Sequence, residues 1–182
     1  IDNCTILSPA PANGRGPPPK SYLNLINGTS LRIFHVFISN SVVKNLFIKT
    51  DSIFFHISIK NSELTYFQAN KNFQSSPIHI HRGYDILYVQ RNMLNIYNTT
   101  VRSFHGDKSV PVFSSLLVID IENVHVSIIQ CEFSQTPQIL KIADKLSKVS
   151  HTPPYYLGIV LNVTVQNSVF TYLANSKLGG AF

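Results

Sequence analysis

The chain has 182 residues, of which 44% are hydrophobic and 13% are charged, and its formal net charge is +6. That charge comes from scarce acids rather than abundant bases, and the bases are scattered instead of clustered as on a nucleic-acid-binding face. No run of 18 apolar residues could form a transmembrane helix. Eight Tyr, twelve Phe and many Asn and Ser favour strands and turns. We therefore expect a β-rich domain with no nucleic-acid partner and no membrane span in this segment.

A short pattern recurs along the chain: Asn or Gln, then Ser, Thr or Cys, then any residue, then an apolar residue. It first occurs as DNCTI at 2–6 and last as QNSVF at 166–170. The polar leaders are Asn3, Asn40, Asn61, Asn98, Gln130 and Asn167. The apolar followers, which we expect to point into a core, are Ile6, Val43, Leu64, Val101, Phe133 and Phe170. The leaders follow one another at intervals of 37, 21, 37, 32 and 37 residues.

Short apolar stretches precede five of the six copies and are predicted to be strands. In chain order they are HVFIS at 35–39, FHISIK at 55–60, MLNIY at 93–97, VHVSII at 124–129 and LNVTV at 161–165. Each unit is therefore strand, polar corner, strand, and 21 residues suffice for one coil of three short strands. The longer intervals fit either one coil with a loop or two short coils. We prefer loop insertions at about 9–20, which is rich in Pro, and at about 134–154, where 137–150 has a helical apolar pattern. The interval from 61 to 98 contains one coil or two.

A coiled parallel sheet explains why Asn recurs at the corners. Asn tolerates the left-handed backbone of a sharp turn better than other residues with a side chain. Stacked coils place successive leaders about 4.8 Å apart, so that their amides can form a ladder of hydrogen bonds. The predicted fold is all-β: a right-handed parallel β-helix, one partial domain over 1–182 and a segment of a longer solenoid. An antiparallel β-sandwich is the alternative, but it does not explain corners at regular positions.

The corner motifs resemble those of extracellular and autotransported β-helix proteins, whose repeats have the form N-C-x-F…G-G-A-I. The matching residues are Asn167-Ser-Val-Phe170 and Gly179-Gly-Ala-Phe182, with Asn3-Cys-Thr-Ile6 as a partial match. The polymorphic outer-membrane proteins are the best-known group with this repeat. Their F-x-x-N element is absent here, because Leu173 stands where it requires Asn. The wider pectin-lyase-like architecture also includes carbohydrate-active enzymes.

This resemblance implies a surface adhesin or scaffold. The expected function is a structural or adhesive segment of a large extracellular glycoprotein, a rigid scaffold that presents loops to partners. The expected partners are glycans, other surface proteins or further copies of the chain. Its expected location is the cell surface or the extracellular space, reached through the secretory pathway. The alternative function is that of a carbohydrate-active enzyme, either a polysaccharide lyase or similar to glycoside hydrolases.

The distribution of acids argues against catalysis within this segment. Glycoside hydrolysis requires two carboxylates that face one sugar, and only Asp120 and Glu122 lie close together among the nine acids. The chain contains neither the Asp-Asp pair nor the Asn-Thr-Asp motif of polygalacturonases. We therefore predict no catalytic residue.

Four Asn-x-Ser/Thr sequons, at Asn3, Asn27, Asn98 and Asn162, favour a secreted glycoprotein. Asn3 and Asn98 coincide with polar leaders, and an amide that points inward in the ladder could not carry a glycan. We therefore predict that Asn27 and Asn162 are the glycosylated sites. For Asn162, which lies on a predicted strand, this requires an outward side chain.

Cysteine and histidine suggest no cofactor. Cys4 and Cys131 both follow a polar leader and are predicted to be small buried side chains at least four coils apart. Four coils correspond to about 19 Å, whereas a disulfide requires Cα atoms within about 7 Å, so we expect no bond between them. His79 and His81 share one strand face and could bind a metal together with His105 or Asp107. Two exposed histidines are the preferred interpretation, and no metal or cofactor is predicted.

Overall fold

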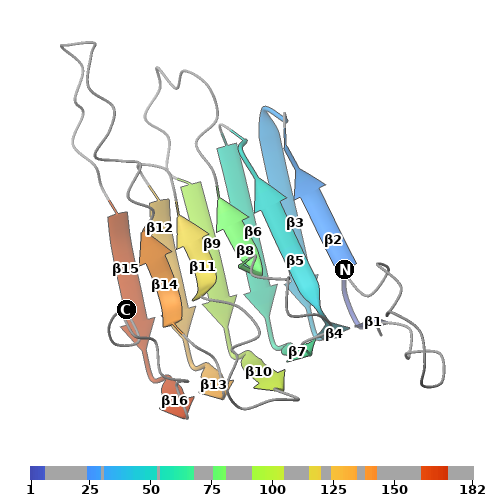
Figure 1. The fold of residues 1–182 in the computed structure, drawn as a ribbon, viewed down its shortest axis with the longest axis vertical. Coiled ribbons are helices and arrows are strands. Elements are labelled where there is room, and N and C mark those ends of the chain that lie inside the picture. Colours follow the sequence, from blue (N-terminus) through green and yellow to red (C-terminus); the bar gives the residue numbers. More distant parts are fainter. Residues whose placement is uncertain are drawn as a thin grey trace, which may run out of the picture.

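The computed structural model describes residues 1–6, 24–29, 31–52, 54–67, 76–80, 92–104, 115–119, 124–134, 138–142 and 161–171. In these ranges the chain forms sixteen β-strands. The described residues include no helix of the length and apolarity that a membrane crossing requires. The strands form three sheets in which every described pair is parallel. In Figure 1 the stack runs from the blue strands near the N-terminus to the red strands near the C-terminus.

The three sheets are named here by the strands that they contain. Sheet A has β3 (Ile33–Ser39), β6 (Phe54–Lys60), β9 (Asn92–Tyr97), β12 (Val124–Ile129) and β15 (Leu161–Gln166). Sheet B has β1 (Thr5–Ile6), β4 (Val42–Lys44), β7 (Glu63–Phe67), β10 (Thr100–Phe104), β13 (Glu132–Ser134) and β16 (Val169–Thr171). Sheet C has β2 (Asn24–Gly28), β5 (Leu46–Thr50), β8 (Ile78–Ile80), β11 (Ser115–Ile119) and β14 (Gln138–Ile142).

The chain visits sheets B, C and A in turn, and each strand pairs with the strand three places further along. Three consecutive strands therefore form one coil, and the architecture is a parallel β-helix, as the corner repeat predicted. The parallel pairing excludes the antiparallel sandwich. Because β6 pairs directly with β9, the interval between Asn61 and Asn98 contains a single coil.

One predicted insertion contains a strand. Within 134–154, residues Gln138–Ile142 form β14, which pairs with β11, so the helical pattern at 137–150 was misleading there. Ile139 and Leu140 are both buried, and stacking on the neighbouring coil outweighs a local helical periodicity. The predicted insertion at 9–20 and residues 143–154 lie outside the described residues.

Like side chains stack in columns inside the coils. In sheet A the register aligns Val36, Ile57, Leu94 and Val126, which are all buried. The alternation of buried and exposed positions along β3 is the period of two that a strand with one face in the core requires. Each coil thus contributes one layer to a continuous apolar core, and contacts are confined to neighbouring coils.

The apolar followers of the corner motif form the core column of sheet B, as predicted. Val43, Leu64, Val101 and Phe133 are in register and have at most 1% of their surface exposed. The rings of Phe133 and Phe170 stack with centroids 5.1 Å apart and an interplanar angle of 7°. The fourth position of the motif is therefore the residue that anchors each corner to the core.

Candidate functional site

The six polar leaders lie at the corners where sheet A turns into sheet B. All six have positive φ, from 43° at Asn98 to 55° at Gln130. This left-handed region is costly for most residues with a side chain, and Asn is the residue that tolerates it best. The corner conformation therefore explains the repeated Asn in physical terms.

Side-chain amides connect four successive corners. Asn98 Nδ2 donates to Asn61 Oδ1 at 3.0 Å, and Asn61 Nδ2 donates to Asn40 Oδ1 at 3.3 Å. Asn40 Nδ2 donates to Asp2 Oδ1 at 3.0 Å, an atom that also accepts from Ser39 Oγ at 2.8 Å. The hydrogen bonds from Ser39 and Asn40 hold the pKa of Asp2 below its usual value. On the first coil the acceptor in this row is therefore the carboxylate of Asp2 instead of an amide oxygen.

The expectation that the ladder amides point inward is wrong. The side chains of Asn40, Asn61 and Asn98 are exposed, because the left-handed turn directs them to the outside of the corner. Water can satisfy the amide groups that the ladder leaves unpaired. The argument that burial prevents glycosylation of Asn3 and Asn98 therefore fails, since both are exposed.

A second row of hydrogen bonds, made by the residue after each leader, was not predicted. Ser41 Oγ donates to Ser39 O at 2.6 Å and accepts from Cys4 N at 3.2 Å. Ser62 Oγ repeats this, donating to Lys60 O at 2.7 Å and accepting from Ser41 N at 3.2 Å. The position requires a small side chain with a donor, which explains why only Ser, Thr and Cys occur there. The restriction to small side chains was visible in the sequence, but the hydrogen bonds that these side chains form with the neighbouring coil were not.

The two cysteines occupy this position at different depths. Cys131 is buried, and its Sγ donates to Ile129 O at 3.2 Å, while Cys4 is exposed and its Sγ donates to Asp2 O at 3.1 Å. The prediction that both are buried is thus wrong for Cys4. Both thiols are free, and four coil steps separate them, as the repeat predicted. Burial raises the pKa of the Cys131 thiol.

These environments predict selective thiol labelling. In the folded chain Cys4 should react with iodoacetamide at neutral pH roughly a hundred times faster than Cys131, because Cys4 is exposed whereas burial blocks access to Cys131 and raises its pKa. Peptide mass mapping after brief labelling measures both sites. In denaturant the two cysteines should react at similar rates, and equal rates in the folded chain would contradict the buried position of Cys131.

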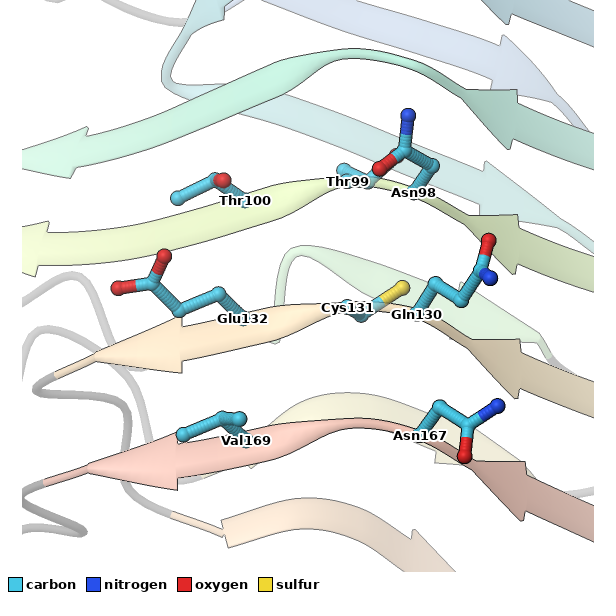
Figure 2. Close-up of a pocket in the computed structure, with 8 residues that line it drawn as sticks. All are labelled: Asn98, Thr99, Thr100, Gln130, Cys131, Glu132, Asn167 and Val169. Carbon is cyan, nitrogen blue, oxygen red and sulfur yellow. The ribbon is translucent and has the colours of Figure 1, made fainter.

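A shallow groove of about 340 Å³ crosses three successive corners (Figure 2). Its lining consists of Asn98, Thr99, Thr100, Gln130, Cys131, Glu132, Asn167 and Val169. In Figure 2 the side chains of Asn98, Gln130 and Asn167 stand at successive turns, and Glu132 lies further along its strand. Among these eight residues Glu132 is the only acid. The groove can hydrogen-bond hydroxyl groups, but its lining does not offer two carboxylates to one sugar.

The remaining predicted residues are dispersed over the surface. Asn27 and Asn162 are both exposed, and Asn27 Oδ1 accepts from Thr29 N at 3.2 Å. His79 is partly buried on sheet C, in register with Lys49. The other residues proposed for metal binding or considered for catalysis lie outside the described residues: His81, His105, Asp107, Asp120 and Glu122. In the part of the chain that the structure describes, no three His, Cys, Asp or Glu side chains form a metal cluster.

Comparison with known proteins adds no family to this geometry. No family model matches the sequence, and neither a curated protein nor a solved structure matches the chain. The functional argument therefore depends on the fold, the corners and the surfaces described above. On these grounds the chain is a parallel β-helix whose polar corners form two rows of hydrogen bonds.

Proposed function

We propose that the chain is a rigid scaffold segment of an extracellular glycoprotein and that its outer faces bind glycans or other surface proteins. The stacking of five coils in one register is the observation that carries this proposal. In such a solenoid each coil contacts only its neighbours, so length and rigidity grow together while the outer faces remain free to vary. The repeat's resemblance to polymorphic outer-membrane proteins supports the same role.

Two surface features support the proposal further. Asn27 and Asn162 lie in sequons and have exposed side chains, which suits glycosylation in a secretory pathway. The corner groove offers amides, hydroxyls and one carboxylate, a polar lining suited to sugar hydroxyl groups. Glycans are therefore the first class of partner to test.

A glycan array combined with a reducing-sugar assay tests the scaffold function. The chain, secreted from eukaryotic cells, should bind one or more glycans without releasing reducing ends. Glycopeptide analysis of the same material should find Asn27 and Asn162 occupied, with Asn27→Gln and Asn162→Gln as controls. Release of reducing ends by the wild type would contradict the scaffold proposal. If the chain binds no glycan on the array, glycans are excluded as its partners and a scaffold that binds surface proteins is the version of the proposal that remains.

A second candidate is a glycoside hydrolase, favoured by one observation on sheet B. The register places Glu63, Thr100 and Glu132 in one row, so that two carboxylates flank a hydroxyl. Two strand spacings separate the Cα atoms of the acids by about 9.6 Å, so side chains that lean toward Thr100 bring their carboxyl groups into the range of about 6.5–9.5 Å found in inverting glycosidases. In this case Glu63→Gln and Glu132→Gln should each abolish sugar release, and activity that survives both substitutions would exclude this pair.

A further inference from the structure

One outward row of sheet A concentrates the side chains that bind transition metals. The register aligns His35 with His56, His56 with Met93, and Met93 with His125. The chain has only seven His and a single Met, so three of its histidines and its only methionine share one row. The sequence intervals between them differ, and coil stacking alone brings them together.

The first three members of this row are within reach of one ion. Register partners in a parallel sheet lie about 4.8 Å apart and project from the same face. The ring centroids of His35 and His56 are 6.2 Å apart. Two imidazoles that share one ion at a metal–nitrogen distance of about 2.1 Å have ring centroids at most roughly 6.4 Å apart. Met93, on the other side of His56 and 36% exposed, can bring a flexible thioether to the same ion.

The neighbouring amide of Asn95 shows which nitrogen of His56 can bind an ion. Asn95 Nδ2 donates to His56 Nε2 at 3.2 Å, so Nε2 is the nitrogen without a proton, and an ion bound there takes the place of this amide donor. The Phe37 ring packs edge-on against both imidazoles, with centroids 5.0 Å from His56 and 6.1 Å from His35, and shields one side from water.

We propose that His35, His56 and Met93 form a copper site on the outer face of sheet A. The donor set selects the metal. No described strand of sheet A carries an acid or a cysteine, so the hard oxygen ligands of Ca²⁺ and Mg²⁺ and the thiolates of structural Zn²⁺ sites are missing there. A thioether beside imidazoles favours Cu(I), the softer ion. Met93 supplies the third ligand that the two histidines lack.

A competition titration tests this site in the intact chain. Cu(I), kept reduced under anaerobic conditions, is titrated against bicinchoninate, and Zn²⁺ is titrated separately. The wild type should bind one equivalent of Cu(I), and X-ray absorption should detect one sulfur neighbour at about 2.3 Å. His56→Ala and His35→Ala should each weaken Cu(I) binding roughly tenfold or more. Met93→Leu should weaken Cu(I) binding similarly, leave weak Zn²⁺ binding unchanged and remove the sulfur signal.

Two matched variants show whether the effect belongs to this row. His79→Ala removes an outward histidine from sheet C, and His125→Ala removes the histidine beyond Met93 in the row; neither should change Cu(I) affinity. Circular dichroism establishes that every variant keeps its β-structure. Wild-type affinity in His56→Ala or Met93→Leu would overturn the proposal. A loss in His125→Ala without a loss in His35→Ala would overturn this ligand set.

Discussion

Replacing Leu94 with alanine is expected to lower the free energy of unfolding by about 3–5 kcal/mol, the upper range for deleting a buried leucine side chain. Leu94 is fully buried on β9, and its register partners Ile57 and Val126 are equally buried. Both neighbouring coils hold these partners in place, so the cavity cannot close by collapse of a surface loop. Urea denaturation followed by circular dichroism measures the loss.

Met93→Ala is the matched control, since it truncates a large apolar side chain at the adjacent position of the same strand. Met93 points outward and is 36% exposed, so its truncation should cost about 1 kcal/mol or less. A shift of β9 by one residue would exchange the two positions between core and solvent. Equal losses in the two variants would therefore contradict the register of β9.

Replacing Asn61 with valine is expected to cost about 2–4 kcal/mol, from a β-branched residue forced into the left-handed region and from lost hydrogen bonds. Asn61 has a φ of 47°, and its amide both donates to Asn40 and accepts from Asn98. The backbone bond from Asn61 N to Tyr97 O, at 3.0 Å, also depends on this corner conformation. Urea denaturation of the variant and the wild type measures the cost.

Asn61→Gly separates the two contributions. Glycine adopts positive φ without a steric cost but cannot form the ladder, so this variant should lose only about 1 kcal/mol. Asn61→Ala should fall between glycine and valine. If glycine and valine cost the same, the amide ladder rather than the backbone conformation would account for the asparagine at this corner.

These two predictions concern different parts of the repeat. Leu94 reports on the apolar column that joins the coils, and Asn61 reports on the turn that lets the chain begin the next coil. Both positions recur in every described coil as residues of similar type, which is why the repeat could be recognised at all. A substitution at one coil should therefore predict the effect of the equivalent substitution at the next.

The sequence by itself determined the fold class, the corner positions and the apolar followers. A residue that must adopt positive φ and a residue that must fill the core leave a local signature, because few side chains satisfy either requirement. The small donor after each leader was equally visible, although its bond to the neighbouring coil was not. The local sequence pattern was misleading at Gln138–Ile142, because these residues have a helical periodicity but form a strand that pairs with β11.

Only the tertiary structure decided which surfaces the coils create. The outward direction of the ladder amides follows from the geometry of the turn, and no spacing rule distinguishes it from an inward one. The row of His35, His56 and Met93 is equally invisible in the sequence, because insertions of different length separate residues that the register places on adjacent strands, about 4.8 Å from one to the next. The coils of a solenoid are joined by backbone hydrogen bonds that do not depend on loop length. Which side chains are neighbours on its surface is therefore known only when the register of the coils is known.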